Sequence, residues 1–346
     1  MIRTHVSEHY NWGWWGRLWA YATFLASGLW ASLFRANQRY DVVIVTSPPL
    51  LIGLLGVWLA RLSRAPLILE VRDLWPDAPV QLGVLTHPLL VQIAYRLEAY
   101  LYRRAQHIVV LTEGYRDVLI NQKKVAPARI TVIPNAADFA LTDAITHHFD
   151  CNAFRQRHAM VDGFWIVYAG AHGLVNRLST VLDAAGNLAD TPARFLFIGD
   201  GTEKLTLQNE VRRRGLKNVR FVDKLPKQDV IPFLLAADVG LTTAPRLPIF
   251  RTVLTNKLFD YFSCRLPVLT MLDGESRRLV EAADAGLFVE PENAEALVWA
   301  IQYYLNHPQL IRQHGENGYR YAQRHFDRRR LAQQYVTILS NVSARW

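Results

Sequence analysis

Arg251, Lys257 and Asp260 lie within ten residues of one another, at a spacing that suits a charged ligand. The apolar residues of 258–262 recur as on one face of a short helix. Lys257 falls in its first turn and Asp260 one turn later, on nearly the same side. A helix N-terminus favours anions, so Arg251 and Lys257 placed there would suit a diphosphate. The Asp260 carboxylate could accept hydrogen bonds from ribose hydroxyls. The residues leave open a second interpretation, a solvated basic loop leading into a core helix.

Two glycine turns follow predicted strands at 164–169 and 194–198. Glycine lets backbone N–H groups approach an anion closely, and the helix after each turn adds its dipole. Neither turn is a dinucleotide fingerprint or a Walker motif, and such turns are also common structural devices. Together with the basic stretch they predict a phosphate-binding pocket. Its candidate residues are Gly170, His172, Gly173, Gly199 and Asp200.

The composition is that of a globular chain of about two domains. It has 346 residues, of which 51% are hydrophobic and 20% charged, with a net charge of +9. Basic character suggests phosphate-bearing partners, which could be nucleotides, an anionic membrane surface or nucleic acid. The arginine triplets at 212–214 and 328–330 are typical of solvated helix faces. Two distant cysteines, Cys151 and Cys264, indicate neither a disulfide framework nor a zinc site.

The N-terminal region is unusual. Residues 1–6 predict a short strand and carry no signal-peptide pattern. Residues 12–34 are rich in tryptophan and tyrosine, and no charge occurs between Leu18 and Phe34. The uncharged run is slightly short for a membrane span and is diluted by polar residues. The pattern therefore favours a helix at a membrane interface, or one docked on the domain, over a transmembrane helix.

From residue 41 onward, apolar strands alternate with helices. Strands are expected at 41–46, 66–71, 105–112 and 130–134, with helices between them. This alternation predicts a parallel sheet with helices on both faces. The 41–46 strand has no polar alternation, a pattern that is typical of a strand buried on both faces and paired on both edges. Ligands bind such sheets at the carboxyl ends of the strands. The polar residues there are Ser47, Arg72, Asp73, Thr112 and Asn135.

A second alternating series begins at Phe164 and continues to residue 342. The sequence thus predicts an α/β protein of two doubly wound Rossmann-like domains facing a cleft. We expect an N-terminal domain at 1–145, a linker at 146–163 and a second domain at 164–327. The final helix, 328–346, could return to the first domain.

Five motifs, in order, resemble the family-four retaining glycosyltransferases of the GT-B fold. They are EVRDLWPDAPVQLGVL (70–85), VIPN (132–135), YAGAHGL (168–174), FIGDGTEK (197–204) and IFRTVLTNKLFDYFSCRLPV (249–268). The resemblance covers nearly the whole chain. Within the family, the sequence is most similar to the bacterial branch that builds O-antigen and colanic-acid polysaccharides.

The resemblance implies a transferase that moves a sugar from a nucleotide-diphosphate sugar, with a UDP-sugar favoured, to a lipid-linked or saccharide acceptor. The second domain would bind the donor, with Arg251 and Lys257 at the diphosphate, Asp260 at the ribose and Glu275 nearby. Arg72 and Asp73 would lie at the reacting centre. Basic groups would stabilise the leaving diphosphate, so we expect neither a metal nor a cofactor. We also expect no nucleic-acid partner and a cytoplasmic, peripheral position at the inner face of the plasma membrane.

The sequence departs from the family pattern at several positions. Where the family has two glutamates eight residues apart, this chain has Thr252 and Asp260. The basic pair expected after the first glycine turn is replaced by Ala171 and Asn176. Arg265 stands where the family has glycine, so the backbone there must accept a strained turn or another cap. The family's opening strand, glycine loop and long helix do not precede Val42, so we expect a first domain incomplete at its start. The 41–46 strand would then be an exposed apolar edge of the sheet.

Two other functions remain open. A nucleotide-sugar epimerase of the same architecture would need a cluster of acids and histidines, for which only Asp73, His172 and Glu275 are candidates. A non-catalytic remnant would bind the nucleotide-sugar without an acceptor site. Transfer to lipid, interconversion of the free donor, or binding alone would separate the three.

Overall fold

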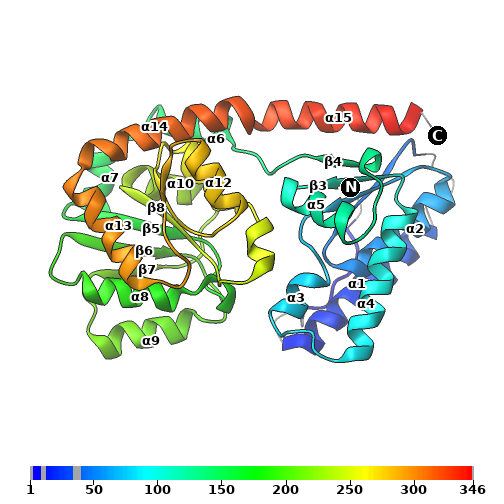
Figure 1. The fold of residues 1–346 in the computed structure, drawn as a ribbon, viewed down its shortest axis with the longest axis horizontal. Helices are drawn as coiled ribbons and strands as arrows, with labels where there is room; N and C mark the ends of the chain where they lie inside the picture. Colours follow the sequence, from blue (N-terminus) through cyan, green and yellow to red (C-terminus); the bar gives the residue numbers. More distant parts are fainter. Residues whose placement is uncertain (1–2, 9–12, 34–39, 345–346) are drawn as a thin grey trace. The chain divides into compact units, whose positions relative to one another are not determined.

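The computed structural model describes residues 3–8, 13–33 and 40–344. The chain forms two compact units, Met1–Pro134 with Ala332–Trp346, and Asn135–Leu331 (Figure 1). Both contain a parallel sheet with helices, as predicted from the alternation of apolar strands and helices.

The first unit contains a four-stranded sheet in the order β1-β2-β3-β4. Its strands are β1 (Val43–Ser47), β2 (Leu67–Val71), β3 (His107–Val110) and β4 (Ile130–Val132). Each neighbouring pair is parallel, with Ser47 opposite Val71 and Val71 opposite Val110. The carboxyl ends of the first three strands therefore lie at one edge, which is where the sequence predicted polar site residues.

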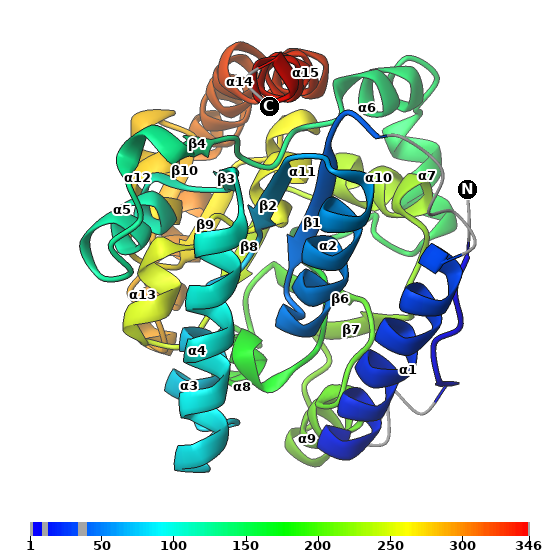
Figure 2. The same ribbon diagram turned by 90° about the vertical axis from the view of Figure 1, so that its right-hand side faces the viewer.

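Helices α1 (Gly13–Leu33), α2 (Leu50–Ser63) and α4 (Pro88–Arg104) lie side by side in the first unit (Figure 2). Two glycines let α2 approach its neighbours closely. A Cβ on Gly53 would lie 2.4 Å from Leu101 of α4, and one on Gly56 would lie 2.7 Å from Val45 of β1. The remaining elements of this unit are α3 (Asp77–Gln81), α5 (Glu113–Asn121), the short η2 (Pro127–Arg129) and most of α15 (Arg328–Ala344).

The edge position of β1 is the one expected for a first domain without the family's opening strand, but its burial on one face only differs from the expectation. It is the edge strand of the sheet, and within the described residues it pairs with β2 alone. Ile44 is 45% exposed, while Val45 is buried. An uninterrupted apolar run thus belongs here to a strand buried on one face, because apolar residues often remain on protein surfaces. The strand expected at 1–6 is also not observed: residues 3–7 are irregular, and residues 1–2 lie outside the described part.

The second unit contains a six-stranded parallel sheet in the order β10-β9-β8-β5-β6-β7. The strands are β5 (Phe164–Ala169), β6 (Ala193–Ile198), β7 (Val219–Val222), β8 (Val239–Thr243), β9 (Val268–Met271) and β10 (Gly286–Phe288). The chain proceeds outward from β5 to β7, returns to β8 beside β5, and continues outward to β10. The point between β5 and β8 is therefore the topological switch, next to which such sheets bind ligands.

Both faces of this sheet are buried. Along β5, Trp165 and Val167 belong to one apolar core, and Ile166 and Tyr168 belong to the other. This alternation fits a strand whose side chains point to opposite faces. The helices are α8 (Leu178–Asn187), α9 (Lys204–Arg214), α10 (Lys227–Ala236), α11 (Asn256–Ser263), α12 (Glu275–Ala282), α13 (Ala294–Asn306) and α14 (Pro308–His325), with short turns η3 (Leu174–Asn176) and η4 (Pro248–Thr252).

The segment 135–163, expected as the end of the first domain and a linker, groups with the second unit. It forms helices α6 (Phe139–Thr146) and α7 (Cys151–Arg157), each capped by an aspartate side chain. Phe139 and Met160 are buried in the second unit's core. Apolar residues at helical spacing thus pack this polar-looking segment onto the domain. In α15, residues 328–331 group with the second unit and 332–344 with the first.

Candidate functional site

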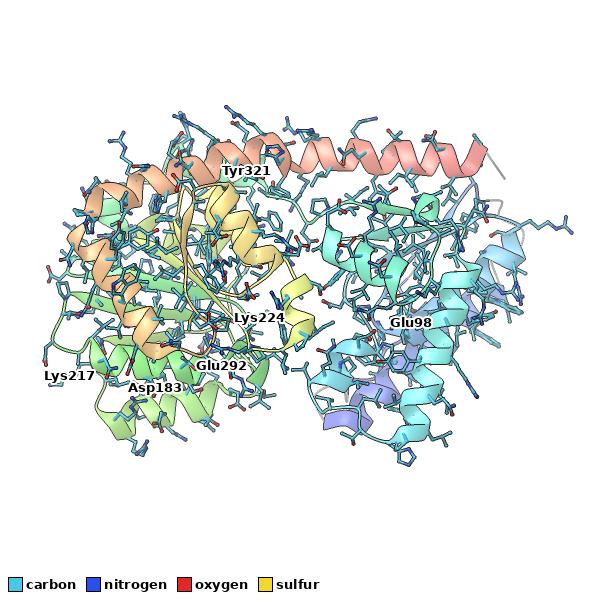
Figure 3. The ribbon with its side chains drawn as sticks, viewed as in Figure 1. Glu98, Asp183, Lys217, Lys224, Glu292 and Tyr321 are labelled. Carbon is cyan, nitrogen blue, oxygen red and sulfur yellow. The ribbon has the colours of Figure 1, made fainter. Side chains whose placement is uncertain are left out.

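A pocket of about 540 Å³ lies at the carboxyl ends of β5 and β6 in the second unit. Its volume is within the usual range for small-molecule sites. Four of the predicted donor-binding residues line it, namely Gly170, Gly199, Asp200 and Asp260. The remaining lining includes Ala169, Ala171, Ile198 and Gly201, together with Lys224, Leu225, Lys227 and Val230, of which Figure 3 labels Lys224.

The Lys257 side chain lies against the glycine turn that follows β5. Its ammonium nitrogen is 4.9 Å from the centre of the Tyr168 ring. Removal from water lowers the pKa of Lys257 to about 8, although the charge of Asp260 opposes this shift. A partly desolvated ammonium gains more from an incoming anion than a fully solvated one does. The geometry therefore brings Lys257 to the turn at which the sequence predicted phosphate binding.

Tyr261 anchors α11, the helix that carries Lys257 and Asp260. Its hydroxyl accepts from the Ala169 amide at 3.2 Å and donates to the Leu241 carbonyl at 3.1 Å. The Ala169 amide belongs to β5, and the Leu241 carbonyl belongs to β8, which pairs with β5. The hydroxyl therefore bonds to both strands at the topological switch. Gly240 leaves room for the ring, since a Cβ there would lie 2.5 Å from it. The sequence analysis counted Tyr261 only as an apolar core residue, because helical spacing does not show where a hydroxyl bonds.

The two glycine turns are packed against each other. A Cβ on Gly199 would lie 1.9 Å from the Gly170 carbonyl oxygen, which only glycine can accommodate. Lys204 supports the second turn from behind: its ammonium donates to the Gly199 carbonyl at 2.9 Å and to Asp223 at 2.5 Å. Because Lys204 is committed to these acceptors, it acts here as a structural cation.

His172, predicted to contact the donor, is fully buried and is not part of this pocket's lining. Its side chain is buried among the rings of Tyr168, Phe197 and Phe221. Neither ring nitrogen has a hydrogen-bond partner among the residues that the structure describes. Burial, and secondarily the Lys204 charge, lowers the pKa of His172 to about 4. Its backbone joins the turns, with its amide donating to the Asp200 carbonyl at 2.8 Å.

Asp260 forms an ion pair with Lys227, with Oδ1 and Nζ separated by 2.6 Å. Both residues line the pocket, and both side chains are about one-third exposed or slightly more. A surface pair of this kind contributes little to stability and can exchange partners at little cost. The carboxylate predicted to bind ribose hydroxyls is therefore in the pocket, beside a lysine that the sequence analysis did not identify.

Three other predicted residues are not part of this pocket's lining. Arg251 pairs with Asp273 at 3.2 Å and lines a smaller pocket of about 300 Å³. Glu275 lies in the first turn of α12 and pairs with Arg278 at 2.5 Å. Gly173 precedes η3 and is not part of the lining. Arg251 and Lys257 are close in sequence, but Arg251 pairs with Asp273 while Lys257 contacts the glycine turn at Gly170.

Arg265 has a left-handed backbone conformation, with φ of 53°. The sequence predicted a strained turn or another cap at this position, because the resembled family has glycine there. Two contacts compensate: the guanidinium carbon lies 3.6 Å from the centre of the Tyr319 ring, and Nε lies 3.2 Å from Glu316. A cation on an aromatic face is worth about 0.5–2 kcal/mol, comparable with the strain of one such residue.

In the first unit, Arg72 and Asp73 follow β2 at the carboxyl edge of the sheet. The Arg72 amide donates to the Ser47 carbonyl at 2.8 Å, which joins this loop to the end of β1. The Asp73 carboxylate accepts from the Tyr115 hydroxyl at 3.4 Å. Burial raises the pKa of Asp73, against the effects of Tyr115 and Arg72. These two predicted residues thus lie together on one loop.

The far end of that loop is held by a partly buried lysine. Lys123 contacts Asp77 at 2.7 Å and Glu98 at 2.9 Å, and Glu98 (labelled in Figure 3) also accepts from the Tyr102 hydroxyl. Burial raises the pKa of Glu98 to about 6, while the hydrogen bond from Lys123 opposes the rise. Asp77 begins α3, so this cluster fixes the loop that carries Arg72 and Asp73. The described residues hold no group of three or more His, Cys, Asp or Glu side chains placed to bind a metal ion.

Comparison with known proteins identifies both units. A family model described as "Glycosyl transferase 4-like domain" matches residues 2–136. A second, described as "Glycosyl transferases group 1", matches residues 150–321. The glycosyl transferase WcaI of Escherichia coli, assigned to colanic acid biosynthesis, is 25% identical over 327 residues, which are 92% of this chain and 79% of WcaI.

Solved structures share the fold at low sequence identity. HepE from Anabaena, in complex with UDP, gives a TM-score of 0.74 at 18% identity, over 94% of this chain and 83% of HepE. Sucrose-phosphate synthase from Thermosynechococcus elongatus gives a TM-score of 0.78, also at 18% identity, over 94% and 79% of the two chains.

Proposed function

Because the chain belongs to the glycosyltransferases of the GT-B fold that build bacterial surface polysaccharides, we propose that it uses a nucleotide-diphosphate sugar, with a UDP-sugar favoured. It transfers the sugar with retention to a lipid-linked or saccharide acceptor. The second unit binds the donor and the first unit binds the acceptor. The chain acts at the inner face of the plasma membrane, in peripheral contact with anionic lipid.

The observation that carries this proposal is the contact of Lys257 with Gly170, which lines one pocket together with Asp260. The amides of the glycine turns and the Lys257 ammonium bind the diphosphate, and the Asp260 carboxylate accepts from the ribose. The UDP bound to HepE, a structure of the same fold, supports a nucleotide donor. We propose Arg251 as a further phosphate ligand, which requires it to leave Asp273.

In the reaction, the bond between the anomeric carbon and the diphosphate oxygen breaks, and a bond from the acceptor oxygen to that carbon forms. The electron pair of the broken bond remains on the diphosphate, and the acceptor's proton leaves with it. Lys257 stabilises the charge that develops there, which is a role that cations perform in many transfer reactions. Positive charge from the protein supplies this effect without a bound metal. Arg72 and Asp73 orient the acceptor.

Labelled UDP-sugars, incubated with the protein with and without bacterial membrane extract, test the function. Transfer of label to lipid is expected, and EDTA should leave it unchanged. Interconversion of the free donor would instead indicate an epimerase, and binding without either reaction a non-catalytic remnant.

Lys257→Ala tests the assignment of the phosphates. A charge-assisted contact to a phosphate contributes about 1.5–3 kcal/mol. The variant should therefore lose affinity for UDP in calorimetry but keep its affinity for uridine. Equal losses for both ligands would show that Lys257 does not contact the phosphates.

A further inference from the structure

From Trp19 to Leu33, one side of α1 is apolar and exposed. Its residues recur every three or four positions, so they form a single stripe. Trp19 is 60% exposed, Trp30 is 66% exposed and Leu33 is 55% exposed. The stripe consists of Trp19, Ala22, Ala26, Trp30 and Leu33. A surface helix of a globular domain normally presents charged or polar residues on its outer side.

The other sides of α1 are covered by the unit itself. Ala20 and Ser32 are buried, and a Cβ on Gly28 would lie 2.6 Å from Leu55 of α2. One flank is covered by the N-terminal segment, because the Ser7 amide and the His5 carbonyl bond to Thr23 and Ser27. The stripe is therefore the outward face of a docked helix, and it remains uncovered by the described residues of this unit.

The C-terminal end of the stripe lies beside the end of α2. Gly28 lies against Leu55, and the Trp58 indole donates to the Ser32 hydroxyl at 3.1 Å, so the two helices run in the same direction. Trp58 is 43% exposed. Arg61 follows it on α2 by three residues, about one helical turn, or ~5 Å. The exposed tryptophans thus approach a basic end of the unit.

At that end, the described residues form a pocket of about 280 Å³ with an apolar floor and an arginine rim. Val57, Ala60, Ala65 and Leu67 line the floor, and Gln106 completes the lining. Arg61, Arg64 and Arg104 line the remainder, and no carboxylate is part of this lining. Planar guanidinium groups suit a phosphate, because each can donate two hydrogen bonds to its oxygens. The pocket lies at the amino ends of β2 and β3, where Leu67 begins β2 and Gln106 precedes β3.

We propose that the stripe and this arginine pocket form one surface that docks on a bilayer containing anionic lipids, with a lipid phosphate in the pocket. The inference rests on the proposed lipid-linked acceptor, which must be met at a membrane. Helices that lie in the membrane interface combine tryptophan and leucine on one face with arginine or lysine at its margin. Of the described helices, none is long and apolar enough to span a bilayer. Tryptophan on one face with arginine at its margin fits binding at the interface, and the charge complementarity selects anionic lipid.

Co-sedimentation with vesicles of phosphatidylcholine, with and without phosphatidylglycerol, tests the surface. The full-length protein should bind the anionic vesicles more tightly, and this preference should weaken in high salt. The triple variant Arg61→Gln/Arg64→Gln/Arg104→Gln should lose about fivefold in anionic-vesicle affinity for each arginine removed. Trp19→Ser/Trp30→Ser should lose binding to both vesicle types. Brominated lipid should quench tryptophan fluorescence in the wild type and less in this variant.

Matched controls lie on the second unit. Trp299→Ser removes a tryptophan that is 59% exposed, and Arg212→Gln/Arg312→Gln/Arg320→Gln removes the same charge from exposed positions. Both should bind vesicles as the wild type does. Equal losses in the controls would overturn the proposal, because they would indicate binding by total charge or hydrophobicity. A wild-type dimer that Trp19→Ser/Trp30→Ser converts to a monomer, without affecting vesicle binding, would instead make the stripe an interface between copies.

Calorimetric titration with UDP separates this inference from the proposed function. The triple arginine variant of the pocket and Trp19→Ser/Trp30→Ser should both bind UDP as the wild type does. Normal UDP binding would also show that these two variants are folded. Wild-type vesicle binding that is lost in the variants supports the surface even if no sugar transfer is detected. Sugar transfer to lipid with unchanged vesicle binding in both variants would overturn the surface and leave the transferase function standing.

Discussion

Gly170 and Lys257 are in direct contact in the second unit: a Cβ on Gly170 would lie 2.4 Å from the lysine Cε and 2.9 Å from its Nζ. Gly170→Ala must therefore displace the ammonium from the turn. We expect calorimetry to show about a tenfold loss in UDP affinity, because part of the free energy of a charged phosphate contact is lost. Gly186→Ala, on α8, is the control and should bind UDP normally. Unchanged affinity in Gly170→Ala would mean that the ammonium position is unimportant.

The lowered pKa of Lys257 predicts a pH dependence of donor binding. Its pKa is about 8 in the free protein. A bound diphosphate would raise this pKa, so the complex holds the proton more tightly than the free protein does. Affinity for UDP should be greatest below pH 8 and should fall by up to about tenfold per pH unit above it. Calorimetry from pH 7 to pH 9.5 measures this fall, and Lys257→Met should bind weakly with a flat profile. An equal slope in the variant would assign the proton to another group.

Asp260→Asn should weaken binding of donors that carry a ribose, because a carboxylate accepts from paired hydroxyls better than an amide does. The comparison uses UDP and 2′-deoxy-UDP against wild type and variant. The wild type should prefer UDP, and the variant should lose that preference. If the deoxy ligand loses equal affinity against both proteins, that hydroxyl does not contact Asp260. Lys227→Met should keep the preference, since Lys227 only pairs with the free carboxylate.

Tyr261→Phe should destabilise the second unit by about 1–3 kcal/mol, because it leaves the part-buried Ala169 amide and the buried Leu241 carbonyl without their partner. It should also weaken UDP binding, since α11 carries Lys257. Denaturant titration and calorimetry measure the two effects. Tyr304→Phe is the matched control: this buried tyrosine bonds to His314, so its loss should lower stability without changing UDP affinity. Equal effects of both variants on affinity would remove the positioning role of Tyr261.

Local patterns were sufficient to predict the parallel sheets and the glycine turns. The apolar run 164–169 is β5, and the spacing in 256–263 is α11, because burial imposes periodicity on the sequence. Contacts between distant residues leave no such pattern. Arg251 was assigned beside Lys257 from sequence proximity, yet its partner Asp273 comes from after β9. Lys227 and the hydroxyl of Tyr261 were missed for the same reason. The exposure of Ile44 on β1 was also missed, because the exposure of one sheet face depends on what covers it.

His172 predicts how the stability of the protein changes in acid. Its pKa is about 4 in the folded protein against a usual 6.5, so the unfolded chain takes up the proton first as the pH falls. The stability of the folded protein that comes from this lowered pKa is fully present above pH 6.5 and is lost as the pH falls toward 4. At pH 5 the loss is about 2 kcal/mol. Urea unfolding at pH 7.5 and pH 5 measures it.

His172→Leu should be less sensitive to acid than the wild type by about that amount. The ring has no hydrogen bond to lose among the described residues, and it lies among aromatic rings, so an apolar side chain fits its surroundings. The backbone bond from residue 172 to the Asp200 carbonyl is kept, so the glycine turns should still bind UDP. His147→Leu, at an exposed position, is the control and should leave the acid sensitivity of the wild type unchanged. If His172→Leu loses as much stability between pH 7.5 and pH 5 as the wild type does, another group takes up the proton.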